Sequence, residues 1–246
     1  MPAALCIAHR GFSATAPENT AVAVRKGMAA GADGCEFDVR LSRDGVVVLM
    51  HDATVDRTTN ATGKVCEHTA AELGRLDAGA WKDEAFAGEP VPRLRDVLAV
   101  MRGTGCLAVV EIKESAIAEP VVAAVREAGM LEATVVIAFE EQVLADAARI
   151  EPALRRGLLL GSDDAGPDAA SLAARAARCG AHLVDLHAPM LSAELVAGLH
   201  ERGCDAWCWT VNEREEMAKL AAWGVDAITT DHPDVMLAWR QSSAAG

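Results

Sequence analysis

The clearest architectural signal in the chain lies in residues 34–52, which read GCEFDVRLSRDGVVVLMHD. Two β-rich runs, at residues 34–39 and 46–50, are separated by a short stretch around Arg43-Asp44-Gly45 that leaves no room for a helix. Turn-forming residues between two such runs indicate a β-hairpin. The segment therefore predicts one antiparallel pair of strands.

The hairpin also predicts which residues face each other. If the chain turns at residues 43–44, paired positions have numbers that sum to about 87. His51 then faces Glu36, and Leu49 faces Asp38. A shift of one residue would reverse these faces, because side chains alternate along a strand.

Outside the hairpin, short β-rich runs alternate with Ala-rich stretches along the whole chain. Such alternation predicts a mostly parallel sheet covered by helices. The other expected strands cover residues 5–8, 107–112, 134–138, 156–160, 183–186, 206–209 and 227–229. The expected helices include residues 20–30, 119–128, 140–150, 169–178, 193–202 and 213–223.

A chain of 246 residues suits an α/β fold of the TIM-barrel type, (β/α)8, as a single domain over residues 1–246. The expected strands number one too many for this barrel, so we interpret one arm of the hairpin as an addition. Residues 53–92 are rich in Thr, Gly and charge and lack periodicity, which indicates an insertion on the catalytic rim. The tail, residues 241–246, is expected to be frayed.

Composition excludes several classes of protein. The chain is 51% hydrophobic and 24% charged, with a net charge of −13, which argues against nucleic-acid binding and against attraction to anionic lipid. We find no secretory signal and no apolar run of about 18 residues, so no membrane insertion is expected. The seven cysteines include no CxxC pair, which favours reduced thiols and a cytoplasmic protein. Oligomeric state leaves no trace in the sequence.

Two motifs in the first part of the chain carry groups suited to chemistry. His9-Arg10 follows the first expected strand, so a proton-transferring imidazole lies beside a guanidinium that can bind an anion. Glu36 and Asp38 share one face of their strand, because side chains alternate. Two buried carboxylates repel each other, and a cation between them removes that conflict.

Two further motifs end later strands. His51-Asp52 follows the second hairpin arm, and Glu111 and Lys113 share one face after the run LAVV. All four motifs lie at the carboxyl ends of strands, where barrel enzymes keep their active sites. Three carboxylates suit one hard divalent cation, Ca²⁺ or Mg²⁺, better than zinc. The flanking cationic side chains predict an anionic substrate, most simply a phosphate ester, and the two histidines predict acid–base hydrolysis.

The chain closely resembles the glycerophosphodiester phosphodiesterase family. The resemblance runs from His9 to Pro233 and rests on the segments HRGFSATAPENT, GCEFDVRLSRDGVVVLMHD, DRTT, VVEIK, WCWTVN and DAITTDHPD. It implies a phospholipase-C-like barrel with a small insertion after the HD motif. It also implies hydrolysis of glycerophosphodiesters, as small-molecule substrates, to sn-glycerol 3-phosphate and an alcohol.

The resemblance assigns roles to individual residues. It implies that one divalent cation is held by three carboxylates, that two histidines act as acid and base, and that two cationic side chains contact the phosphate. These are, in the same order, Glu36, Asp38 and Glu111; His9 and His51; Arg10 and Lys113.

Other residues have two open interpretations. Trp209 either packs in the core or walls the glycerol pocket together with Asn212. Asn19 or Thr20 is a helix N-cap, whereas the resemblance makes Glu18 and Asn19 neighbours that support the site. Residues 56–59 are expected to form a structural turn.

Three other functions compete with this one. A binuclear zinc amidohydrolase requires H-x-H on the first strand, where this chain has His9-Arg10-Gly11. A lysophospholipase D would use similar residues but favours an apolar or basic surface for the bilayer. A catalytically silent barrel that binds phospho-ligands should have lost a carboxylate or histidine, and none is missing.

Overall fold

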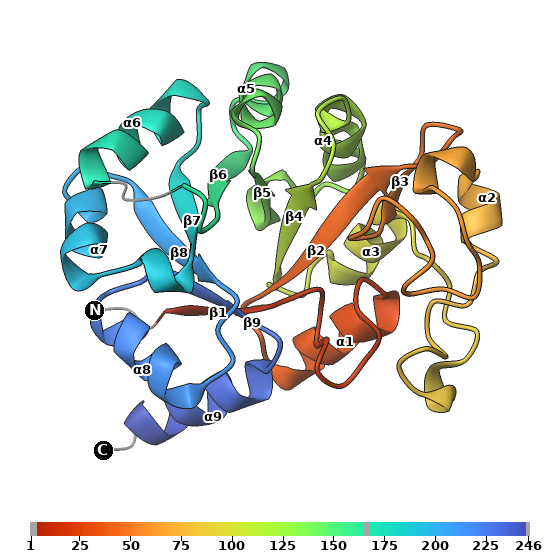
Figure 1. The fold of residues 1–246 in the computed structure, drawn as a ribbon, viewed down its shortest axis with the longest axis horizontal. Helices are drawn as coiled ribbons and strands as arrows, with labels where there is room; N and C mark the ends of the chain where they lie inside the picture. Colours follow the sequence, from red (N-terminus) through yellow and green to blue (C-terminus); the bar gives the residue numbers. More distant parts are fainter. Residues whose placement is uncertain (1–3, 165–167, 245–246) are drawn as a thin grey trace.

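The computed structural model describes residues 4–164 and 168–244. It confirms the barrel: parallel strands form a closed ring with helices around it (Figure 1). The ring closes because β1 pairs with both β9 and β2. Its strands are β1 (Leu5–Ala8), β2 (Gly34–Leu41), β4 (Leu107–Ile112), β5 (Thr134–Ala138), β6 (Arg155–Leu160), β7 (Leu183–His187), β8 (Asp205–Trp209) and β9 (Ala227–Thr230).

Helices cover the outside of this ring (Figure 1). Those with two turns or more in the described chain are α1 (Ala21–Ala30), α3 (Leu94–Met101), α4 (Ala118–Glu127), α5 (Glu141–Ile150), α6 (Ala169–Arg178), α7 (Ala193–His200), α8 (Arg214–Ala222) and α9 (Pro233–Ala244). Short 3-10 turns, η3 (Leu131–Ala133) and η4 (Ala188–Met190), lead into β5 and follow β7. Residues 241–244 of the tail continue α9, and residues 245–246 lie outside the described residues, so the expected fraying stays a prediction.

Side chains of each strand alternate between two cores. Val110, Val136 and Val184 point outward and pack against the helices. Their neighbours point inward and fill the barrel, with Trp207 as the largest of them. On the inner face, the polar groups gather at the carboxyl ends of the strands, and apolar side chains fill the rest of the barrel.

The hairpin forms, but its register differs from the prediction by one residue. Strand β3 (Val47–Leu49) is antiparallel to β2 and pairs Leu49 with Val39. The turn contains three residues, not two, because the Ser42 amide donates to the Val46 carbonyl at 3.0 Å. Gly45 adopts φ 77°, a left-handed conformation that glycine takes at little cost and that accommodates the extra residue.

The chain between β3 and α3 forms an excursion with a small core of its own. It contains η1 (Val65–Glu67), α2 (Ala70–Leu73) and η2 (Glu84–Phe86), and it lies beside β3 and α1 (Figure 1). Its apolar cluster includes Met50, Val55, Val65, Leu73 and Val91. Within the described chain, no helix has both the length and the hydropathy that a bilayer crossing requires.

Candidate active site

A cavity of about 240 Å³ opens at the carboxyl ends of the barrel strands. Most of its wall divides into an ionic part and an apolar part, and Asp185, Thr210 and Thr229 also line it. The ionic part is lined by His9, Arg10, Glu36, His51, Glu111 and Lys113. The apolar part is lined by Ile137, Phe139, Leu159 and Trp209.

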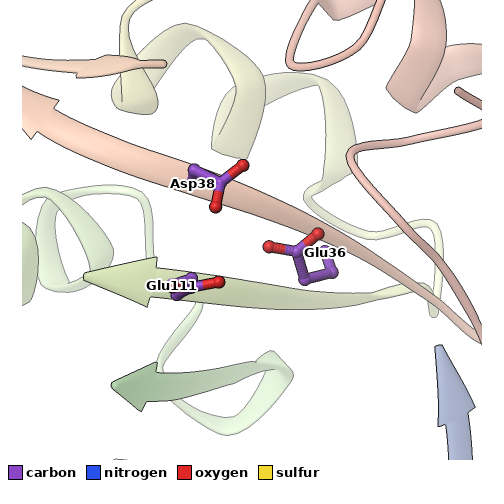
Figure 2. A group of neighbouring side chains, drawn as sticks. All are labelled: Glu36, Asp38 and Glu111. Carbon is purple, nitrogen blue, oxygen red and sulfur yellow. The ribbon is translucent and has the colours of Figure 1, made fainter. Parts of the chain in front are cut away.

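The three carboxylates lie together on neighbouring strands. Glu36 and Asp38 project from the same face of β2, and the register of the sheet places Glu111 of β4 beside Asp38. One oxygen from each of the three side chains lies within 4.8 Å of the others (Figure 2). All three side chains are buried.

Asp38 is the best supported of these carboxylates. The Asn19 side chain donates to its Oδ2 at 2.7 Å and accepts from its backbone amide at 2.9 Å. Lys113 Nζ lies 2.9 Å from its Oδ1 and Arg10 Nε lies 3.4 Å from its Oδ2. Burial alone would raise the pKa of Asp38, but the charges of Lys113 and Arg10 lower it to about 2. Asp38 is therefore ionised at neutral pH.

Glu36 and Glu111 are less well compensated. Glu36 Oε2 accepts from the Arg10 amide at 2.9 Å, whereas its buried Oε1 has no partner among the described residues. Burial, with the charges of Asp38 and Glu111, raises the pKa of Glu36 well above its usual range. Burial and the charge of Asp38 raise the pKa of Glu111 to about 7. A bound cation would relieve this excess of negative charge, and a set of carboxylate oxygens suits a hard divalent ion. The three side chains therefore fit the metal site that the sequence predicts.

His9 is held in place by a carboxylate that the sequence motifs did not identify. Its Nδ1 lies 2.7 Å from Asp231 Oδ1, while its Nε2 lies 4.0 Å from Glu36 Oε2. Ser13 and Asn212 both donate to Asp231 at 2.8 Å. These bonds lower the pKa of Asp231 even though burial opposes the shift. The signal that could have found it is the motif TTDHPD, in which Asp231 directly follows the last strand, β9.

His51 has a similar partner, Asp52, whose Oδ1 lies 2.7 Å from His51 Nδ1. Arg57 donates to both oxygens of Asp52, at 2.7 and 3.1 Å, and to both oxygens of Glu18, at 2.8 Å each. Glu18 in turn accepts from Arg10 at 2.7 Å. The DRTT turn was expected to be structural. Its Arg57 links Asp52, the partner of His51, to Glu18, the partner of Arg10.

The predicted facing of His51 and Glu36 does not occur as a strand pair. Because β3 ends at Leu49, His51 lies in the bend after the strand. The Arg40 side chain donates to the His51 carbonyl at 2.9 and 2.8 Å and fixes this bend. His51 nevertheless lines the same cavity as Glu36. Burial lowers the pKa of His51.

The segment PENT shows how a short motif divides its tasks. Thr20 is the N-cap of α1 and accepts from the Ala23 amide at 3.3 Å. Asn19 adopts φ 56° and Arg10 adopts φ 53°, conformations that few residues other than glycine adopt. Such strain is typical of functional sites. Here it places Asn19 against Asp38 and the Arg10 amide against Glu36.

Trp209 and Asn212 occupy different places. Trp209 lines the cavity and packs edge to face against Phe139, with the two ring centroids 5.7 Å apart. Its Nε1 donates to the Asp185 carbonyl at 3.1 Å. Asn212 instead accepts from the Asp231 amide at 2.9 Å and donates to its carboxylate. It does not line the described cavity but lies beside Asp231, so its place in the glycerol pocket stays a prediction.

Ionisable side chains at the carboxyl ends of barrel strands are typical of barrel enzymes. Residues 9–235 match the family model described as the glycerophosphoryl diester phosphodiesterase family. A glycerophosphodiester phosphodiesterase of Caldanaerobacter subterraneus is 37% identical over 95% of this chain and 96% of its own length. The chain belongs to the glycerophosphoryl diester phosphodiesterase family and is a phosphodiesterase enzyme.

Solved structures agree with this assignment. A glycerophosphodiester phosphodiesterase of Agrobacterium tumefaciens has a TM-score of 0.84 at 32% identity, covering 96% of this chain and 99% of that one. An Oleispira antarctica phosphodiesterase, solved in complex with the product sn-glycerol-3-phosphate, has a TM-score of 0.88 at 27% identity, covering 97% of each chain.

Proposed function

We propose that the protein hydrolyses glycerophosphodiesters to sn-glycerol 3-phosphate and an alcohol. The observation that carries this proposal is the convergence of three buried carboxylates with two histidines on one ionic wall. The product named for the Oleispira antarctica structure supports the choice of a glycerol-containing substrate.

The carboxylates Glu36, Asp38 and Glu111 would hold one divalent cation, Ca²⁺ or Mg²⁺. When bound, such an ion polarises a phosphoryl oxygen and stabilises negative charge in the transition state. The unpartnered Oε1 of buried Glu36 supports this assignment, because a lone carboxylate oxygen is costly to bury.

His9 and His51 carry the proton transfers. We assign His9 as the base that deprotonates the attacking oxygen. If this oxygen is water, one step gives sn-glycerol 3-phosphate. If it is a neighbouring glycerol hydroxyl, departure of the alcohol leaves a cyclic phosphate, and a second attack by water opens this ester to sn-glycerol 3-phosphate. His51 is assigned as the acid that protonates the leaving alcohol. The lowered pKa of Asp52 and of Asp231 keeps both partner carboxylates ionised, so each can orient its imidazole and stabilise the imidazolium that forms.

Arg10 and Lys113 bind the phosphate oxygens. Both side chains line the cavity, and both already neutralise the charge of Asp38. They hold a diester between the two histidines, where charge develops as the phosphorus is attacked. Trp209 walls the side of the cavity opposite this ionic cluster.

The test is a headgroup assay with a cation series. Purified protein is incubated with glycerophosphocholine in chelator, Ca²⁺ or Mg²⁺, and release of sn-glycerol 3-phosphate is measured. Release that requires a cation supports the proposal. Turnover of lysophosphatidylcholine alone would favour the lysophospholipase D alternative, and a folded protein without turnover under any cation would favour a binding barrel.

The organisation and location of the chain are proposed on separate grounds. We assign residues 1–246 to one barrel domain with residues 53–92 as an insertion, since the small core of the excursion packs beside β3.

The cysteines are free thiols, although Cys35 and Cys106 lie with their Sγ atoms 4.0 Å apart. Reduced neighbouring thiols support a cytoplasmic location.

A further inference from the structure

One buried acidic group in the cavity has no task in the mechanism above. Asp185 lies in the middle of β7, has 1% of its surface exposed and lines the cavity. Its Oδ1 is buried and has no hydrogen-bond partner among the described residues. A buried carboxyl without a partner is costly, so its presence in an otherwise apolar part of the cavity requires an explanation.

The surroundings of Asp185 separate it from the metal site. Its register partners on the adjacent strands are Leu159 and Trp207, both buried inside the barrel. Burial, followed by the charge of Glu111, raises the pKa of Asp185 well above its usual range. The cationic side chains of the cavity, Arg10 and Lys113, lie against Asp38 rather than Asp185, so phosphate is expected at those two side chains.

The geometry points to Asp185 as the residue that accepts a hydrogen bond from a hydroxyl group of the glycerol part of the substrate. This inference rests on the proposed function and adds a specificity-determining residue to it. A hydroxyl is a donor, and a carboxyl oxygen accepts from it in either protonation state. The ionic wall holds the phosphate at Arg10 and Lys113, which leaves the glycerol to extend toward the apolar wall and Asp185.

The assignment explains how the enzyme would select glycerol esters. A site with a buried polar group rejects an analogue that lacks the matching partner, because the group then stays unpaired. Trp209 supports this arrangement because its Nε1 donates to the Asp185 carbonyl at 3.1 Å, which fixes this position of β7 next to the apolar part of the cavity.

The experiment compares two ligands that share the phosphate group but differ in glycerol. Binding of sn-glycerol 3-phosphate and of inorganic phosphate is measured by calorimetry on the full chain in Mg²⁺. Wild type should bind sn-glycerol 3-phosphate more tightly than phosphate. Asp185→Leu should weaken sn-glycerol 3-phosphate binding by about 10- to 100-fold and leave phosphate binding unchanged. Asp185→Asn, which keeps an acceptor oxygen, should remain within a few-fold of wild type.

Stability provides the control for folding. Asp185→Leu removes an unpaired buried carboxyl, so its Tm should equal or exceed that of wild type. If this variant fails to fold, Asp185→Ala serves instead, with the same expected contrast between the two ligands.

Three results would overturn the inference: equal weakening of both ligands, no weakening of either, or wild-type binding that does not distinguish them. A variant defective only toward glycerophosphocholine, with normal sn-glycerol 3-phosphate binding, would assign Asp185 to the alcohol headgroup and also overturn it. Failure of wild type to hydrolyse any glycerophosphodiester would instead contradict the proposed function, so the two failures are distinguishable.

Discussion

At the scale of single residues, the two histidines of the cavity have equivalent support. Each has its Nδ1 2.7 Å from an aspartate oxygen, which leaves the Nε2 atom free to face the substrate. This arrangement fixes the tautomer and the orientation of each ring. The proposed chemistry therefore requires both imidazoles and both of their partners.

Replacing either histidine should abolish most turnover. His9→Ala and His51→Ala are each expected to lower kcat by at least about 100-fold, because one general acid or base typically contributes that much. Cation binding, measured by calorimetry, should persist because neither imidazole is assigned as a ligand. Near-native turnover in both variants would contradict the mechanism.

The aspartate behind His9 should matter because it orients the imidazole and stabilises its charged form. Asp231→Asn removes the charge that stabilises an imidazolium and disturbs its tautomer, so kcat should fall by about 100-fold or more with little change in Tm. A matched control exists in His200, whose Nε2 lies 2.8 Å from Asp226 outside the cavity lining. Asp226→Asn should leave kcat within a few-fold of wild type. Equal losses in the two variants would indicate a structural effect.

At the scale of elements, the loop after β1 depends on close approach to α1. Gly11 adopts φ 77°, and a Cβ placed there would lie 2.5 Å from the Ala23 carbonyl carbon. Gly45, in the hairpin turn, has the same φ of 77°, but a Cβ at that position would meet no atom within 4 Å. The two positions therefore separate backbone strain from steric overlap.

Gly45→Ala should lower the free energy of unfolding by about 1 kcal/mol, the usual cost of a left-handed residue with a Cβ. Gly11→Ala should lower it by more than about 2 kcal/mol, because α1 must also move. It should reduce kcat as well, since the loop carries His9 and Arg10. Urea unfolding measures the free energy of unfolding of both variants, and an activity assay measures kcat. Equal losses of unfolding free energy in the two variants would contradict the packing argument.

The hairpin shows how far the sequence leads at this scale. Alternation and turn residues predicted its two strands, but the length of the turn is set by one left-handed glycine, and this moved the register by one residue. Asn19 and Asp231 were similarly hard to place. Closure of the barrel between β9 and β1 brings Asp231 to His9, which is 222 residues away in the sequence. Asn19 reaches Asp38 because the consecutive strands β1 and β2 pair with each other.

At the scale of the whole molecule, the barrel itself was predictable because its signal is repeated in every β-α unit. The excursion after β3 has no such repetition, and its tertiary contacts depend on individual side chains. Arg57 is an example: its partners Asp52 and Glu18 come from separate segments. Long-range pairing of this kind leaves no local pattern to read.

The buried carboxylates make the stability of the whole molecule depend on pH when no cation is bound. Burial and the charge of Asp38 raise the pKa of Glu111 from about 4.5 to about 7, so the folded state retains a proton that the unfolded state loses. Stability from this group is complete below about pH 4.5 and is lost as the pH rises to about 7. His51 acts in the opposite direction because its pKa is lowered.

The measurement compares the pH dependence of stability in wild type with that in Glu111→Gln. Wild type in chelator should lose stability relative to Glu111→Gln between pH 5 and pH 7. Saturating cation should abolish the loss, since a cation favours the ionised carboxylates. Parallel pH profiles of the two proteins in chelator would show that Glu111 titrates normally.

The most direct test of the account is a cation titration of chelator-treated protein that follows release of sn-glycerol 3-phosphate from glycerophosphocholine. For wild type we predict no release without cation and full activity once one ion per chain is bound. Glu36→Gln, which keeps the shape of the side chain but removes its charge, should require far more cation and reach far lower activity. Undiminished activity in chelator, or a Glu36→Gln titration that superimposes on wild type, would contradict the claim that these carboxylates hold an essential cation.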